Sequence, residues 1–283
     1  MIVDPILALE ALGYTEREAA FLYLVAVHSG YFLRRQFDYF IDRNKGALVM
    51  RFLEKARICG HIEVLDYKQG WYVYRLFSRA IYRLFGNPES QHRRRKGDSL
   101  VRIRLMALDY VLENDGDHYF ETEAERIRFF VDDRRIAQEL FVDDDGRLYS
   151  LLASFPISVA DRTQPSRSLV RFVFIDEGLA TAEKFLRFLS LADSLFRAIG
   201  SFELIYVSGS TANFSIARDA FWNRFSGALP KSARLFDEDV HAVADRDRKA
   251  LRAQFTTLLL EYSYPKLQRS EVRGSREGSH ADR

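Results

Sequence analysis

The order of local structural signals between residues 14 and 76 constrains this chain more than any other feature. Thr15 is a good helix N-cap, and Glu18 follows at the spacing of a capping box, in which side chain and backbone satisfy each other's free groups. Apolar residues then recur at helical spacing until Ser29-Gly30. The sequence therefore predicts a first helix that starts after Thr15 and ends near Gly30.

Two further helices are predicted before residue 60. Leu33, Phe37 and Phe40 form the apolar stripe of a short helix that leaves Arg34 and Arg35 on its outer side. The next helix begins after a cap at Asp42 or Asn44 and is predicted to bury Ala47, Met50 and Leu53. Another face of this helix carries Asn44, Leu48, Arg51 and Lys55, and we call it the candidate reading face.

A strand pair completes this pattern. Gly60 ends the third helix, and residues 61–66 and 71–76 are rich in β-forming residues on either side of the turn Lys68-Gln69-Gly70. Three helices followed by a hairpin is the order of a winged helix-turn-helix unit, whose third helix enters the major groove of duplex DNA. The hairpin is then the predicted wing.

The basic and polar residues of this segment are the candidate DNA contacts. Arg51 is the best candidate for reading base edges, whereas Arg34, Arg35, Arg43, Lys45 and Lys68 suit phosphate contacts that fix register. Ordinary solvated charges are the alternative interpretation, and apolar Leu48 and Phe52 near the reading face indicate either a protein interface or contacts to thymine methyl groups. The full candidate set is Arg34, Arg35, Arg43, Asn44, Lys45, Arg51, Lys55, Lys68, Gln69, Arg93, Arg94, Arg95 and Lys96.

The charge of the chain is unevenly distributed. Residues 1–110 hold 18 Lys and Arg against 12 Asp and Glu, while the remaining residues hold 24 against 28, for a formal net charge of +2 overall. The basic half is the half with the predicted winged helix, as expected when one domain faces phosphates. The single cysteine excludes an intramolecular disulfide, and no apolar run reaches membrane-spanning length, so we expect a cytoplasmic protein.

The middle of the chain is predicted to connect two domains. Residues 78–85 form a short amphipathic helix, and residues 87–96 read as a flexible linker that ends in the basic cluster 93–96. That cluster suits a phosphate backbone or a minor groove, or simply keeps a linker soluble. A helix over residues 100–112 is predicted to bridge the domains or to support dimerisation.

The second half is predicted to be an α/β domain with a small central sheet, so the fold class is α+β. Residues 169–175 and 202–207 are apolar strands on either side of a helix over 183–199, which indicates a βαβ unit covered on both faces. We also predict a capping box at Thr122 and Glu125, a strand over 147–152, and helices over 213–225 and 239–262. The predicted divisions are 1–86 (winged helix), 87–117 (linker and bridging helix), 118–268 (α/β domain) and 269–283 (disordered tail).

Catalytic signals are few. Asp145-Gly146 and then Asp176-Glu177 at the end of a strand follow the layout of a metal-dependent nuclease core, in which carboxylates on neighbouring strands hold Mg²⁺. The lysine of that pattern is missing, Phe174 stands where a carboxylate is needed, and only Lys184 is near in sequence. Turn formation explains the acidic run at 143–145 equally well. We therefore assign no catalytic residue, metal ligand or cofactor.

The chain resembles a known family through weak, mostly hydrophobic motifs over about residues 10–225. Gln36-Phe37, Leu53 and Gly60-His61-Ile62 resemble the winged helix of replication-relaxation proteins, which occur on plasmids and other mobile elements. Asp145-Gly146, residues 171–176 and 202–207 resemble the nuclease-like domain that follows in some of them, without the Glu-x-Lys of an active nuclease. The resemblance implies a DNA-binding protein of a mobile element with a degenerate second domain.

The sequence thus predicts a sequence-specific double-stranded DNA-binding protein that acts as a dimer, since a twofold pair of recognition helices doubles the contacts. Transcriptional regulation, or an accessory role in plasmid or mobile-element replication or mobilisation, suits such a protein. A metal-dependent nuclease or nickase and a winged helix that binds protein are the alternatives.

Overall fold

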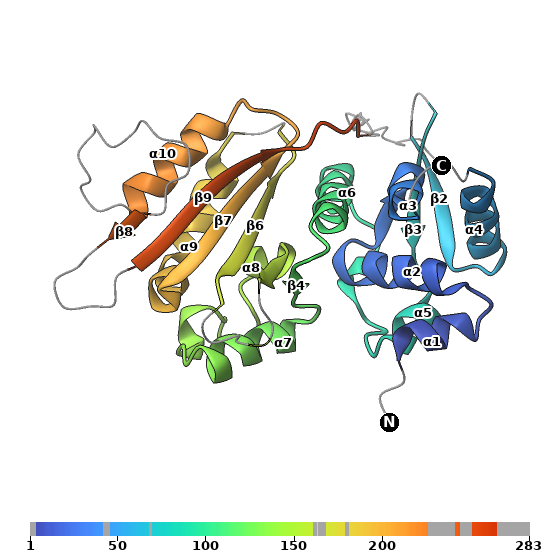
Figure 1. The fold of residues 1–283 in the computed structure, drawn as a ribbon, viewed down its shortest axis with the longest axis horizontal. Coiled ribbons are helices and arrows are strands. Elements are labelled where there is room, and N and C mark those ends of the chain that lie inside the picture. The colour runs from blue at the N-terminus through green and yellow to red at the C-terminus, as the bar shows by residue number, and fades with distance from the viewer. Residues whose placement is uncertain are drawn as a thin grey trace, which may run out of the picture.

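The computed structural model describes residues 4–41, 46–67, 70–160, 163, 168–178, 181–225, 241–243 and 251–264. Helices and strands are mixed, as predicted (Figure 1). A three-stranded sheet lies in the N-terminal unit and a six-stranded sheet in the second half. The proposed tail at 269–283 lies outside the described residues.

The N-terminal unit combines five helices with a small antiparallel sheet. Its elements are α1 (Pro5–Glu10), α2 (Glu16–His28), β1 (Tyr31–Leu33), α3 (Arg34–Phe40), α4 (Gly46–Ile58), β2 (Ile62–Tyr67), β3 (Trp71–Leu76) and α5 (Arg79–Leu84). The strand order is β1-β3-β2, so β3 occupies the centre. The capping box at Thr15 and Glu18 is present, and Gly60 has the positive φ of 68° that suits the end of a helix. Neither α1 nor β1 was expected from the sequence.

Phe52 lies at the centre of an aromatic core. Its ring centroid is 4.1 Å from that of Phe37, 6.0 Å from that of Phe21 and 6.1 Å from that of Phe32. The buried residues of α4 are Val49, Phe52, Leu53 and Ala56, which recur at the i, i+3, i+4, i+7 spacing of one helical face. The predicted face was therefore wrong in three places: Ala47 and Met50 are exposed, and Phe52 is buried.

The segment 87–96 packs against the N-terminal sheet, so the prediction of a flexible linker was wrong. It contains a short 3-10 helix, η1 (Gln91–Arg93). The Tyr31 hydroxyl donates to the carbonyl of Arg94 and accepts from the amide of Lys96, at 3.1 and 2.8 Å. A Cβ on Gly30 would stand 2.1 Å from the carbonyl oxygen of His92, so this contact requires glycine, as does the φ of 79°.

Helix α6 (Asp98–Glu113) is buried on most of its surface and joins the two units. Leu105, Met106 and Tyr110 belong to a large hydrophobic cluster that fills the second unit and also includes Tyr31 and Val73 of the N-terminal sheet. Leu108 and Leu112 belong to the cluster around Phe52. In Figure 1, α6 stands between the two units. The predicted bridging helix is therefore present, with cores on two sides.

The second unit is built around a mixed sheet. Its helices are α7 (Glu123–Arg128), η2 (a π-helix, Phe129–Asp133), η3 (Gln138–Leu140), α8 (Ser150–Ser154), α9 (Glu183–Ile199) and α10 (Phe214–Phe225). Its strands are β4 (His118–Tyr119), β5 (Ile157–Val159), β6 (Val170–Asp176), β7 (Ser201–Ser208), β8 (His241–Val243) and β9 (Leu251–Leu259). The order is β4-β5-β6-β7-β9-β8, with β6, β7 and β9 parallel.

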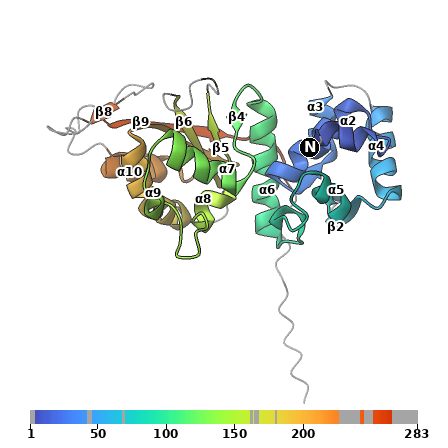
Figure 2. The same ribbon diagram turned by 90° about the horizontal axis from the view of Figure 1, so that it is seen from below.

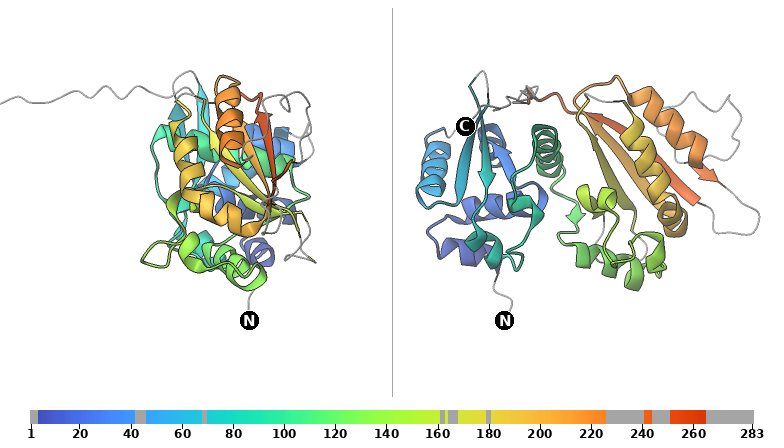
Figure 3. Two further views of the ribbon diagram at one scale, coloured as in Figure 1. Left: turned by 90° about the vertical axis from the view of Figure 1, so that its left-hand side faces the viewer. Right: turned by 180° about the vertical axis from the view of Figure 1, so that it is seen from behind.

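Helices α9 and α10 cover one face of this sheet, as Figures 2 and 3 show. Phe196 of α9 packs against Phe172 and Phe202, on β6 and β7 respectively, at 4.8 and 4.5 Å between ring centroids. Helix α6 also contacts β6. Successive side chains of a strand point to opposite faces, so the neighbours of Phe172 along β6 point to the face opposite α9. The predicted βαβ unit is confirmed.

Two predicted elements of the second unit were wrong. The predicted strand over 147–152 is reduced to a bridge between Val142 and Leu148, after which α8 begins. The predicted helix over 239–262 is instead β8 and β9. Strand β9 pairs in parallel with β7 along residues 201–208 of β7. Pairing with this edge of the sheet makes the segment extended instead of helical, and the β-branched residues Thr256 and Thr257 favour a strand.

Among the described helices, none combines the length and the apolar character that crossing a membrane requires.

We predict that Phe52→Ala lowers the free energy of unfolding by about 3–5 kcal/mol, because it removes the ring that three other rings surround. Met50→Ala is the matched control on the exposed face of the same helix and should change stability by less than about 0.5 kcal/mol. Urea denaturation monitored by circular dichroism measures both. The reverse ranking would contradict the burial of Phe52.

We predict that His28 makes the protein less stable in acid. Burial, and then nearby Arg126, lower the pKa of His28 from 6.5 to about 3. The unfolded chain therefore binds a proton below pH 6.5 that the folded protein does not, so stability falls as the pH drops from 6.5 toward 3. When the pH is lowered from 7 to 5, the free energy of unfolding of the parent protein should fall by about 2 kcal/mol more than that of His28→Gln. Equal losses would contradict a neutral His28.

Candidate nucleic-acid interface

Helix α4 presents an exposed face beside the hairpin of β2 and β3. One side of α4 packs into the aromatic core through Val49, Phe52 and Leu53, so the side chains on its other side face solvent. Arg51 is exposed, as the sequence predicts, and no described residue forms a hydrogen bond or ion pair with it. Three large apolar side chains are also exposed on α4: Leu48 (46%), Met50 (51%) and Ile58 (71%). The exposed polar residues are Arg51, Glu54 and Arg57.

Arg34 lies next to the beginning of α4. It is exposed, and its Nη2 atom stands 3.5 Å from the place of a Cβ on Gly46. Its positive charge also acts on the Tyr74 hydroxyl of β3, although burial is the larger influence and raises the pKa of Tyr74. Arg34 is therefore placed where α3, α4 and β3 converge.

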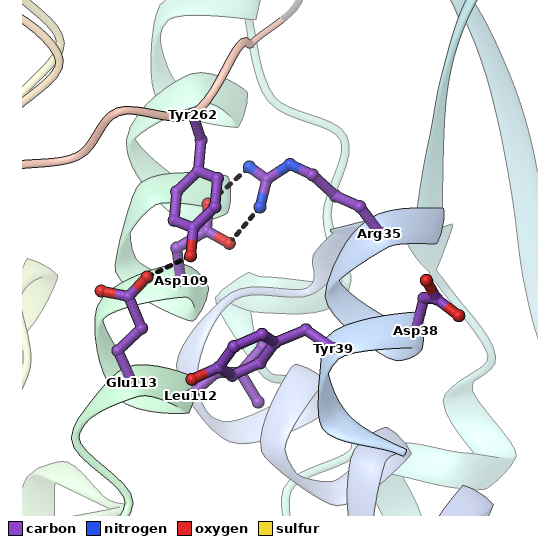
Figure 4. A pocket seen from close by; sticks show the side chains of 7 residues that line it. All are labelled: Arg35, Asp38, Tyr39, Asp109, Leu112, Glu113 and Tyr262. Atoms are coloured by element: carbon purple, nitrogen blue, oxygen red, sulfur yellow. Dashed lines mark hydrogen bonds and ion pairs between the residues drawn. The ribbon is translucent and has the colours of Figure 1, made fainter. Parts of the chain in front are cut away.

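Arg35 is engaged inside the protein, which contradicts its predicted place on the outer side of the helix. Its two terminal nitrogens donate to the Asp109 carboxylate of α6 at 2.6 and 2.7 Å (Figure 4). The guanidinium also stands 4.2 Å from the ring centroid of Tyr262 and 5.3 Å from that of Tyr264. These tyrosines follow β9, so Arg35 connects α3, α6 and the C-terminal segment. A phosphate contact is no longer its expected role.

Tyr264 completes this ion pair. Its hydroxyl donates to Asp109 at 2.7 Å, while burial, and then the Asp109 carboxylate, raise the pKa of Tyr264. The hydroxyl therefore keeps its proton and remains a donor. We call Arg35, Asp109, Tyr262 and Tyr264 the interdomain latch.

Lys55 is also an internal contact. Its ammonium forms an ion pair with Glu18, donates to the carbonyl of Gly13 at 2.9 Å and lies 4.9 Å from the Tyr14 ring centroid. It therefore anchors the last turn of α4 to the start of α2. The assignment of Lys55 to the reading face was wrong, because an adjacent carboxylate already neutralises it.

The basic cluster at 93–96 is divided by its packing. The side chains of Arg94 and Arg95 are exposed, whereas Arg93 is half-buried and lies 3.8 Å from Glu89. Lys96 is half-buried, and burial, followed by Arg104 and Arg94, lowers its pKa. Arg94 and Arg95 are thus the members of the cluster that remain accessible.

Five of the predicted residues are not described by the structure, and two large side chains that were not predicted as candidates are exposed on the hairpin. Arg43, Asn44, Lys45, Lys68 and Gln69 lie outside the described residues. Val64 and Tyr72 are exposed on the hairpin, where Tyr72 pairs with Asp66. The alternation of residues along β2 and β3 could have identified them.

The nuclease-like positions have partners within the protein. Asp176 accepts hydrogen bonds from the Tyr206 hydroxyl, the Asn213 amide at 3.0 Å and the Gly178 backbone at 3.0 Å. Glu177 is buried and accepts a 2.7 Å hydrogen bond from Ser99. Lys184 lies 3.7 Å from Glu177. These interactions hold both carboxylates at the end of β6, where the Oε2 atom of Glu177 is buried and has no hydrogen-bond partner among the described residues.

The acidic run at 143–145 forms a turn. The Asp143 carboxylate accepts from the amides of Asp145 and Arg147, at 3.1 and 2.9 Å, and Gly146 has a φ of 72°. Among the described residues, no group of three or more His, Cys, Asp and Glu side chains could hold a metal ion.

Comparison with protein-family models, curated proteins and solved structures found no significant match.

We predict that Arg35→Met lowers the free energy of unfolding by about 2–4 kcal/mol, because the Asp109 side chain is only 4% exposed and would lose its cation. Arg34→Met, one residue away and exposed, should cost less than about 0.5 kcal/mol. Adding Asp109→Asn to Arg35→Met should restore part of the loss. Additive effects of the two changes would contradict the latch.

Proposed function

We propose that the protein binds double-stranded DNA through a winged helix in which α4 is the recognition helix. The observation that supports this most is the topology: α2, β1, α3, α4, β2 and β3 follow in chain order, with β3 between β1 and β2. In this fold class the third helix of the unit enters the major groove and the hairpin lies beside it. Here α4 is that helix.

The surface of α4 supports the same proposal. Arg51 and Arg57 are exposed on it, and Arg34 lies at its beginning. An arginine on such a helix can donate two hydrogen bonds to guanine, while arginines at its margin neutralise phosphates. Leu48 and Met50 then suit contacts with thymine methyl groups.

The biological role follows from recognition of duplex DNA. One helix reads only a few base pairs, so we propose a dimer on a palindromic site and a role as a cytoplasmic transcriptional regulator. The resemblance to replication-relaxation proteins supports an accessory role in mobile-element replication or mobilisation as the other form of this proposal.

A winged helix that binds another protein is the second candidate. The exposed Leu48, Met50 and Ile58 favour it, because three large apolar side chains on one helix are typical of a protein interface. Salt dependence separates the candidates, since phosphate contacts release counterions and an apolar interface does not.

We predict different consequences for two arginines of the interface. Arg51→Ala should weaken binding to the preferred sequence by about 1–3 kcal/mol and relax preference at one base position. Arg34→Ala should weaken binding to all duplexes alike and reduce the salt slope by about one unit. Selection of bound oligonucleotides from a random pool supplies the duplex, and fluorescence anisotropy at several salt concentrations measures binding.

Arg187→Ala is the matched control, because Arg187 is exposed on α9, away from α4. Its affinity and salt slope should equal those of the parent protein. Retention of both affinity and sequence preference by Arg51→Ala would refute base reading by α4. Failure of the parent protein to enrich any sequence would refute the proposed function itself.

A further inference from the structure

A cleft separates the N-terminal unit from the end of α6 and β4. Its volume is about 690 Å³, which lies in the range of small-molecule sites. A second hollow of about 240 Å³ shares Tyr39, Leu112 and Glu113 with it and continues to the interdomain latch (Figure 4). The two hollows adjoin at these three residues, and the smaller one is bordered by α3, α6 and the segment after β9.

The lining of the larger hollow combines an apolar wall with negative charge. Phe40, Leu112 and Tyr119 contribute to the wall, with Tyr39 exposed at the junction of the hollows. The carboxylates of Glu113, Asp115, Asp117 and Glu121 surround it, and no Lys or Arg is among the described residues that line it. An anion would be repelled there, whereas an organic cation would be attracted.

The four carboxylates differ in whether they form hydrogen bonds or ion pairs with other residues of the protein. Asp117 forms an ion pair with Arg171, and Glu121 accepts a hydrogen bond from Tyr23. Glu113 accepts one from Tyr262 of the latch. Asp115 is exposed, and no described residue holds it by a hydrogen bond or an ion pair. Asp115 and the remaining oxygen of Glu113 are the best acceptors for a ligand.

His28 provides an independent indication of a ligand. Its side chain lines the cleft with an exposed fraction of only 9%, and neither ring nitrogen has a hydrogen-bond partner among the described residues. The ring edge packs on Tyr119, with 5.3 Å between centroids. Because this imidazole lines the cleft, a ligand bound there can form a hydrogen bond with it. The neutral ring adds no positive charge to the cleft.

We propose that this cleft binds an organic cation with an apolar or aromatic body. Its ammonium group would lie among Glu113 and Asp115, its body against Tyr39, Phe40 and Tyr119, and a polar atom beside His28. Aromatic faces attract cations in addition to their apolar contact. The site is separate from α4 and does not depend on the proposed recognition of DNA.

A regulatory consequence rests on the proposed function. Tyr39 belongs to α3, which precedes the recognition helix, whereas Glu113 ends α6 and contacts the latch. A ligand that touches both fixes the N-terminal unit relative to the second unit. On the proposed function, occupancy of this cleft is expected to change DNA affinity, as at a small-molecule effector site.

Isothermal titration calorimetry of the full chain with tryptamine tests the site. Tryptamine is a cation at neutral pH, and indole-3-acetate carries the same ring with a negative charge. We expect tryptamine to bind and indole-3-acetate to bind at least about tenfold more weakly. Equal binding of the two, or no binding of tryptamine, would overturn the proposal.

Variants assign the binding to this cleft. Glu113→Gln combined with Asp115→Asn should weaken tryptamine binding about tenfold, and His28→Gln should weaken it several-fold. Asp144→Asn, which removes an exposed carboxylate of the 143–145 turn, should leave it unchanged. Unaltered affinity in the double variant would overturn the assignment. Because calorimetry needs no DNA, failure of the ligand site is distinguishable from failure of the proposed function.

Discussion

The burial of α6 on two sides is the constraint on which the rest of the structure depends. Met106 and Tyr110 face the large cluster that fills the second unit and reaches the N-terminal sheet, while Leu108 and Leu112 face the cluster around Phe52. A helix that is apolar around most of its circumference must be covered on all those sides. The two units therefore share α6 instead of being joined by a free linker.

The same burial explains the latch and the cleft. Asp109 lies on α6 among apolar residues, and a buried carboxylate requires a cation and hydrogen-bond donors. Arg35 comes from α3 and Tyr264 from beyond β9, so three separated segments meet at one carboxylate. Beyond this contact, α6 ends in acidic residues that the N-terminal unit does not cover, and the cleft opens there. A rotation of one unit relative to the other would have to alter these contacts.

The residues that sequence reasoning placed correctly are those governed by local signals. The capping box at Thr15, the N-cap at Thr122, the end of α4 at Gly60, and the βαβ unit of β6, α9 and β7 depend on neighbouring residues or on continuous periodicity. The reciprocal half of the predicted box at Thr122 is absent, because Glu125 accepts from the amide of Glu121. Arg35, Lys55 and β9 were misjudged for a common reason. Their partners are Asp109, Glu18 and the edge of β7, which lie far away in sequence, and composition does not reveal which charge or edge will be nearby.

The sequence by itself determined the succession of α2, α3, α4 and the hairpin of β2 and β3, the mixed α and β character and the exposure of Arg51, because side-chain periodicity and capping act over a few residues. The tertiary structure alone decided which basic side chains are neutralised internally, that the segment 87–96 is packed, and that an acidic cleft lies between the units. Those outcomes depend on desolvation and on charges brought together by folding, which no local pattern encodes.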